Sequence, residues 1–156
     1  RRSHAAFLGR MPGTPSYRNV LRHPGAQQSP GVLILRMDAS FYFGNVTFLK
    51  EMIRDTMAAA AEPPSVVILD ASSINRLDSS ANAAVAETVR SPSEQGAPFI
   101  LAGLKGPVID ALRRSGIDRE VAGAAPHLAV HDAIVALEAD PPQNEPAARA
   151  DVRTAS

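Results

Sequence analysis

The loop that follows an apolar run at residues 66–69 carries the side chains best suited to chemistry. The chain reads VVILDASSINRLDSSA from Val66 to Ala81, and Asp78, Ser79 and Ser80 come just before a helical pattern. A short apolar run rich in β-branched residues is typical of a strand covered on both faces. Ligands of open α/β sheets bind beyond the carboxyl ends of strands, where the first amides of the next helix are unpaired donors. The three residues therefore suit contact with an anion, and they equally suit capping of the helix.

Other polar residues stand where predicted strands end or helices begin. The segment AGLKGP, from Ala102 to Pro107, joins a strand to a helix but lacks the GxxxxGK[ST] spacing of a nucleotide-hydrolysing loop. Weak binding of a nucleotide or another anion at helix amino termini, assisted by Lys105, fits this segment better. For Asp70, capping of its own loop is the alternative to lining the site. The candidate residues for binding an anion or nucleotide are Asn45, Asp70, Ser79, Ser80 and Lys105.

The sequence offers no convincing catalytic set or metal site. His127 and His131 are four residues apart, as in a helical metal pair, but no third ligand is close in the sequence. One exposed and one capping histidine is the simpler interpretation. A nucleophile at Ser79 or Ser80 would need a His base, and a G-x-S-x-G elbow is absent. We therefore predict a protein that is not an enzyme and needs no cofactor beyond weak nucleotide binding.

Composition limits the remaining classes. The chain has 156 residues, no cysteine, and equal numbers of basic and acidic residues, sixteen of each. Zero net charge provides no overall basic field for nucleic acid, and the lack of cysteine excludes disulfides. No window approaches the roughly 20 apolar residues of a membrane helix. We expect one soluble domain, and because the chain starts at Arg1, a piece of a longer protein.

Strand and helix patterns alternate along the chain. The first thirty residues are rich in Gly and Pro and predict an extended segment with an edge strand at Ser16–Leu21. Buried strands are predicted at Val32–Met37, Val66–Asp70 and Phe99–Ala102. Helices are predicted after Asn45 as N-cap, after Ala81, from Pro107 as first residue, and around Ala133 to Leu137. Such alternation predicts an α/β fold with parallel crossovers, a domain over residues 1–138 and a disordered tail over 139–156.

Five motifs, taken in order, resemble one known family. They are PGTPSYRNV, PGVLILRMDASFYFGN, VVILDASSINRLDSSA, LAGLKGPVIDALRRSGI and VHDAI. Their order and spacing resemble the STAS domain, the cytoplasmic carboxyl-terminal domain of sulfate permease (SulP) anion transporters, over about Leu8 to Leu137. The first two motifs resemble the transporter branch and not the free-standing anti-sigma factor antagonists that share the fold.

This resemblance implies a mixed β-sheet of four to six strands covered by α-helices. It further implies a regulatory domain at the cytoplasmic face of the membrane, as part of a multi-pass protein. The implied partners are the transmembrane domain of the same transporter and further copies of the domain. Sulfate is the first candidate for the transported anion, with other oxyanions or bicarbonate as alternatives.

The resemblance also bears on the loop at Asp78-Ser79-Ser80. Anti-sigma factor antagonists carry a D-S-S-G pattern there, and its second Ser or Thr is phosphorylated; Ser80 matches that position. Ala81 replaces the family glycine, whose backbone freedom alanine lacks. A phosphate on Ser80 would be favoured by the helix dipole and opposed by Asp78. Two alternatives stay open: a free-standing antagonist switched by a kinase, and a small nucleotide-binding domain.

Overall fold

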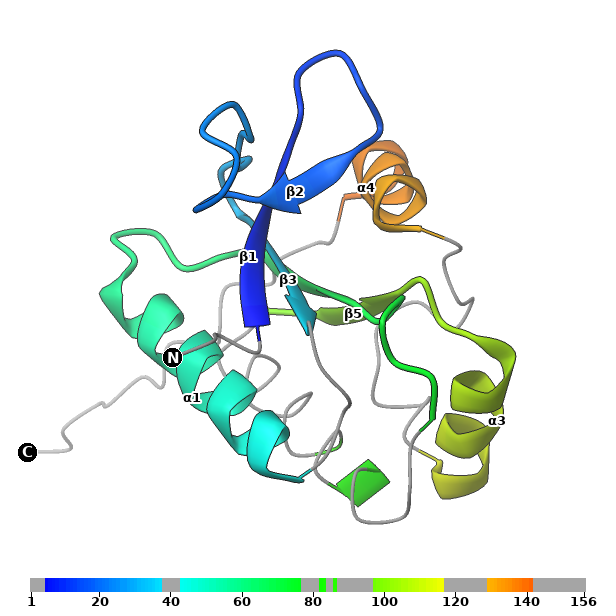
Figure 1. Cartoon of the computed structure of the whole chain (residues 1–156). Helices are drawn as coiled ribbons and strands as arrows, with labels where there is room; N and C mark the ends of the chain where they lie inside the picture. The colour runs from blue at the N-terminus through cyan, green and yellow to red at the C-terminus, as the bar shows by residue number, and fades with distance from the viewer. Residues whose placement is uncertain are drawn as a thin grey trace, which may run out of the picture.

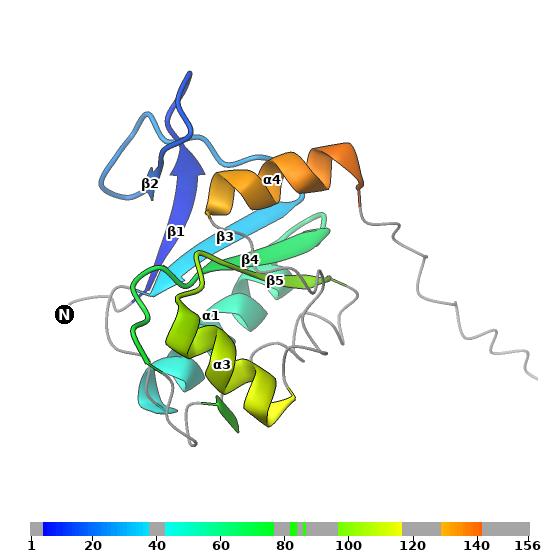
Figure 2. The ribbon, with the colours of Figure 1, turned by 90° about the vertical axis from the view of Figure 1, so that its right-hand side faces the viewer.

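Runs of apolar residues form the centre of a five-stranded mixed sheet, whose order is β2-β1-β3-β4-β5. The computed structural model describes residues 5–37, 43–76, 82–83, 86, 97–116 and 129–141. The strands are β1 (Ala5–Arg10), β2 (Tyr17–Asn19), β3 (Val32–Met37), β4 (Val66–Asp70) and β5 (Phe99–Ala102). The last three pair in parallel, whereas β1 is antiparallel to both β2 and β3 (Figure 1 and Figure 2). The predicted α/β class and mixed sheet are confirmed.

Helices cover both faces of this sheet. The described helices are α1 (Phe43–Ala59), α3 (Gly106–Ser115) and α4 (Val130–Ala139). Figure 2 shows α1 and α3 on one face and α4 on the other. Leu35 and Leu69 belong to the buried cluster that includes Val108 of α3, while Ile34 and Ile68 belong to the cluster that includes Ala133 of α4. Successive residues of the central strands thus face opposite layers, as the period of a strand requires.

The predicted bounds of β3, β4 and β5 agree with the structure, and two helix starts need correction. Asn45 is not the N-cap of α1, because the helix already begins at Phe43 and Asn45 lies in its first turn. The backbone N–H groups of the first helical turn have no hydrogen-bond partner within the helix. A sequence pattern therefore does not distinguish a first-turn residue from the N-cap that precedes it. Pro107 is the second residue of α3, with Lys105 as the N-cap.

β1 is a strand that the sequence pattern did not predict. Its Ala5, Ala6 and Leu8 are buried, and it lies between β2 and β3 in the sheet. Alanine and glycine favour strands weakly, so AAFLGR becomes a strand through its two neighbours. The predicted edge strand at Ser16–Leu21 exists as the shorter β2. Most of the helix predicted after Ala81 lies outside the described residues, and residues 82–83 and 86 are helical.

The chain crosses over β1 at Gly9 to reach β3. Arg10 exchanges two backbone hydrogen bonds of 2.8 Å with Gln27, on the side of β1 opposite β2. A Cβ at Gly9 would lie 2.9 Å from backbone atoms of Ala26 and Gln27. Only glycine therefore lets the connection lie directly on β1.

We expect Gly9→Ala to lower the free energy of unfolding by about 1–3 kcal/mol, because the crossing backbone must move. Urea unfolding of the 156-residue chain measures the change. Gly25→Ala is the matched control, since a Cβ built there would meet only the flexible end of Met11, at 3.6 Å. It should change the free energy of unfolding by less than about 0.5 kcal/mol, because an exposed surface position of this kind tolerates substitution. Equal stabilities of the two variants would contradict the steric explanation.

Candidate functional site

The carboxyl ends of β4 and β5 bring two loops together. Asp70 pairs with Ala102 in the register of these strands, and the N–H of Ala71 donates to the Ala102 carbonyl at 2.8 Å. The Asp70 Oδ1 accepts a 3.0 Å hydrogen bond from the N–H of Ser72. This is the turn that an Asp side chain forms with backbone two residues on. The predicted capping role of Asp70 is therefore observed, at the edge where α/β sheets bind ligands.

Gly103 sets how closely the two loops approach. Its φ of +70° is a left-handed conformation that side chains other than glycine rarely adopt. A Cβ there would lie 3.2 Å from the Ser72 Cβ and 3.3 Å from the Asp70 Oδ1. The Asp70 turn thus packs against the backbone at Gly103. Sequence analysis had assigned no role to this glycine, although a strand followed by Gly is a usual signal of a special turn.

Lys105 ties the second loop to the first. Its Nζ donates a 2.5 Å hydrogen bond to the Oδ1 of Asn75, in the loop that follows β4. Lys105 is also the N-cap residue of α3, and its carbonyl accepts hydrogen bonds of 3.0 Å from Val108 and Ile109. The ammonium group therefore lies at an exposed helix start whose first turn holds no acidic residue. Such an arrangement suits a weak, solvent-exposed anion contact.

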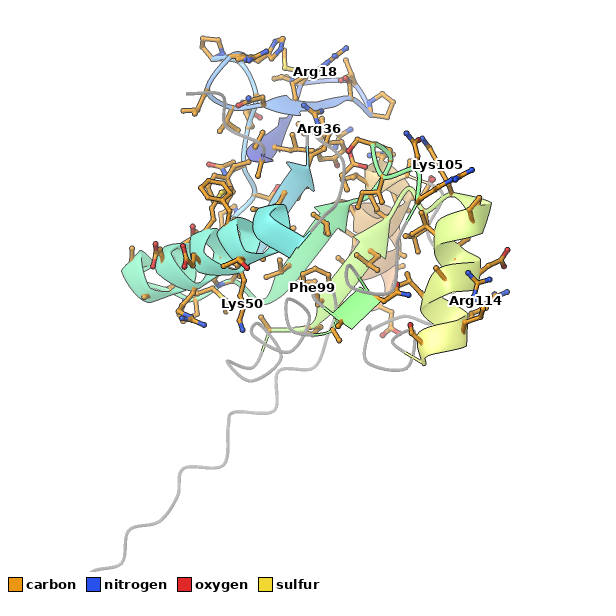
Figure 3. All side chains as sticks on the ribbon, turned by 60° about the horizontal axis from the view of Figure 1, so that its bottom comes forward. Arg18, Arg36, Lys50, Phe99, Lys105 and Arg114 are labelled. Atoms are coloured by element: carbon orange, nitrogen blue, oxygen red, sulfur yellow. The ribbon has the colours of Figure 1, made fainter. Side chains whose placement is uncertain are left out.

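Arg36 and Asn75 are residues at this edge that sequence reasoning missed. Arg36 of β3 lies opposite Asp70 of β4 in the parallel register, on the face that α4 covers. Figure 3 shows Arg36 and Lys105 toward the same edge of the sheet, whereas Arg114 lies further along the outer side of α3. The sequence did contain a signal for Arg36, because it stands near the carboxyl end of a predicted strand, as Asp70 does in the next one. Asn75 had none, because its partner is thirty residues away.

The structure brings some predicted residues together and leaves others undescribed. Asp70 and Lys105 belong to adjoining loops. Asp78, Ser79 and Ser80 lie outside the described residues, and of Asn45 only the backbone, within α1, is described. The predicted site as a whole stays a prediction.

His131 makes a contact that the sequence did not reveal. Its Nδ1 lies 3.5 Å from the Tyr17 hydroxyl, which joins the edge strand β2 to α4. The pKa of Tyr17 is raised above its ordinary value, mainly because the hydroxyl is partly buried. The positive charge of Arg10 opposes this shift, and the negative charge of Glu138 adds to it. His127, the other half of the proposed metal pair, lies outside the described residues. Among the residues that are described, no three His, Asp or Glu side chains gather to hold a metal ion.

A shallow hollow of about 280 Å³ lies at the opposite edge of the sheet. Gly31, Ser65, Ile134 and Leu137 are among the residues that line it, next to the amino ends of β3 and β4. None of the predicted site residues lines this hollow. None of the described helices combines the length and the apolar composition needed to cross a bilayer.

Comparisons with known proteins agree with this architecture. The probable sulfate transporter 4.2 of Arabidopsis thaliana is 31% identical over 140 residues, which cover 84% of this chain and 21% of that protein. The structure of the murine anion transporter Solute Carrier 26 family member A9 superposes with a TM-score of 0.77 at 19% identity, over 90% of this chain and 23% of that one. An anti-sigma factor antagonist fold from Thermotoga maritima superposes with a TM-score of 0.59 at 19% identity, over 72% of this chain and 92% of that one.

The fold is of a type found both in an anion transporter and in an anti-sigma factor antagonist fold. The STAS domain family matches residues 23–133, and the chain belongs to this family. It spans about a fifth of the length of the sulfate transporters it matches. The resemblance inferred from the five motifs is thereby confirmed.

The contact at Gly103 can be separated from its backbone conformation. Gly13 has nearly the same φ, +73°, but nothing lies within 4 Å of a Cβ built there. We expect Gly13→Ala to cost about 1 kcal/mol in unfolding free energy from the left-handed conformation alone. Gly103→Ala should cost about 1 kcal/mol more, because its Cβ pushes on the Asp70 turn.

Amide hydrogen exchange provides the second measurement for this pair. The Ser72 amide should exchange faster in Gly103→Ala and at an unchanged rate in Gly13→Ala, since only the former disturbs its bond to Asp70. Unchanged Ser72 exchange in both variants would show that the two loops do not depend on each other.

Proposed function

We propose that this chain is the STAS domain of a longer membrane transporter for an inorganic anion, with sulfate as the first candidate. The observation that carries the proposal is the match to proteins named sulfate transporters, at 30–31% identity over 84–85% of this chain. Each match covers only 20–22% of the relative, as expected for one domain of a larger protein. The domain extends over residues 1–138, at the cytoplasmic face, and residues 139–156 form a tail.

The domain acts by contact and not by catalysis. Its partners are the transmembrane part of the same transporter and further copies of itself. The carboxyl edge of the sheet is the contact surface, because its loops are held by Asp70, Gly103 and the bond from Lys105 to Asn75. Asp78, Ser79 and Ser80 follow Asn75 by three to five positions in the sequence. A charge added at Ser80 would therefore enter the same segment of the chain as Asn75.

Uptake of labelled sulfate by cells producing the full-length gene product tests this role. We expect removal of residues 1–138 to abolish uptake with normal membrane insertion, because the contacts to the transmembrane part are lost. Removal of residues 139–156 alone is the control and should leave uptake unchanged. Ser80→Asp and Ser80→Ala should differ from each other in uptake, since only the former adds charge.

Two outcomes would contradict the transporter role. Uptake that is indifferent to loss of residues 1–138 removes its basis. A native gene without membrane segments of about 20 apolar residues does so as well. Either result favours the free-standing antagonist, and phosphorylation of Ser80 by a partner kinase would then be the next measurement.

We further propose that the start of α3 binds an anion or the phosphates of a nucleotide weakly. Lys105 supplies the charge, and the Gly106 amide supplies one backbone donor, since Pro107 has no N–H and the Val108 and Ile109 amides donate to the Lys105 carbonyl. The Asn75 Oδ1 holds the ammonium group near this helix start. The binding is weak because this lysine is exposed and its charge is screened.

Calorimetric titration of the 156-residue chain with ATP, and separately with sulfate, measures this binding. We expect Lys105→Ala to weaken the affinity about tenfold, since it removes a charge-assisted hydrogen bond. Asn75→Ala should weaken it less, and Arg114→Ala, an equal charge change at the far end of α3, should leave it unchanged. Equal losses of affinity in Lys105→Ala and Arg114→Ala would show that the anion responds only to the net charge of the chain.

A further inference from the structure

The charges of this neutral chain are separated along its sequence. The first 37 residues contain six arginines and no acidic residue, so all sixteen Asp and Glu side chains come later. Within this stretch the side chains of Arg10, Arg18, Arg22 and His23 are exposed. A chain with no net charge thus presents one basic region, formed by the β1–β2 hairpin and the turn that follows.

That turn presents an exposed leucine between two of the arginines. Leu21 is 89% exposed, the most exposed of the large apolar side chains that the structure describes. Arg18 lies in β2, and Arg22 follows Leu21 directly. We call Arg18, Leu21, Arg22 and His23 the basic turn.

The exposure of Leu21 is imposed by the fold. The side-chain Oδ1 of Asn19 accepts a 3.0 Å hydrogen bond from the N–H of Leu21. The Asn19 carbonyl accepts two more, from Arg22 at 3.1 Å and His23 at 3.0 Å. The N–H of Val20 donates to the Phe7 carbonyl at 3.1 Å, which fastens the turn to β1. Three hydrogen bonds within the turn and one to β1 thus hold an apolar side chain in water, at an energetic cost that a partner would remove.

The basic turn lies at an edge of the sheet that faces outward. β2 is the last strand of the sheet on this side and is only three residues long. Figure 1 shows the hairpin and its following loop projecting at one end of the molecule, away from α3. Figure 3 likewise separates Arg18 from Arg114. A flat surface can therefore reach the basic turn without touching the carboxyl edge at α3.

We propose that the basic turn docks this domain onto a membrane surface rich in anionic phospholipid. Arginine guanidinium groups pair with lipid phosphates, and Leu21 enters the boundary between headgroups and acyl chains. The charge separation supports this occupant, since an anionic bilayer attracts the basic region and repels the acidic remainder. The leucine at its centre supports a lipid over a purely ionic partner. This inference does not depend on which anion is transported or on whether transport occurs.

Co-sedimentation of the 156-residue chain with vesicles tests the docking. One set of vesicles is phosphatidylcholine, and the other contains phosphatidylserine in addition. We expect binding only to the second set, weakened by added salt. The double variant Arg18→Ala/Arg22→Ala should bind about 30-fold more weakly, since each arginine near an anionic surface contributes about fivefold. Leu21→Ser should also bind more weakly. Its loss of affinity should change less with added salt than the loss caused by removing the arginines.

Arg113→Ala/Arg114→Ala is the matched control, because both arginines are exposed on α3 and the net charge changes equally. It should bind vesicles as the unchanged chain does, and circular dichroism establishes that every variant is folded. Equal weakening by the control overturns the proposal, as does the absence of binding that depends on phosphatidylserine. Binding to poly-glutamate without binding to vesicles would assign the basic turn to an acidic protein and likewise overturn it. Unchanged binding of Leu21→Ser overturns the insertion of the leucine.

Discussion

The parallel pairing of β3, β4 and β5 is the constraint on which the rest of this structure depends. Parallel strands need crossover connections, and these connections cover both faces of the sheet. Alternate residues of β4 accordingly enter two different cores, one beneath α1 and α3 and one beneath α4. Because β4 has a paired strand on each side and a helical layer on each face, it cannot shift by one residue without exchanging its two cores. The packing of both cores therefore depends on this register.

The same register creates the candidate site. Since the three strands run in one direction, their carboxyl ends meet at one edge, and the loops that follow must share it. Asp70 closes its own turn, Gly103 lets the neighbouring loop lie against that turn, and Lys105 reaches across to Asn75. The edge is thus held by short polar contacts on a buried apolar base. A surface of this kind can present a contact or a charge at a defined position without any catalytic group.

The antiparallel hairpin at the amino end gives the domain a second surface, which is basic and carries an exposed leucine. β1 pairs with β3 through Ala5, Ala6 and Phe7, and Gly9 allows the returning chain to cross it. The crossing leaves the turn after β2 exposed and fastened by Asn19. Acidic side chains are absent from this part of the sequence, so the hairpin is basic while the domain is neutral. The hairpin lies at one end of the molecule, away from α3 (Figure 1).

The sequence alone determined the three parallel strands, because runs such as VLIL at 32–35 and VVIL at 66–69 are apolar without interruption, as is typical of a strand covered on both faces. It also determined the family, through five motifs in a fixed order. Tertiary structure decided what local pattern does not encode. AAFLGR has weak strand propensity and becomes β1 by pairing with two neighbours, and the N-cap expected at Asn45 lies inside α1. Lys105 finds Asn75 thirty residues away, because a contact across adjoining loops depends on the register of two strands and leaves no periodic signal in the chain.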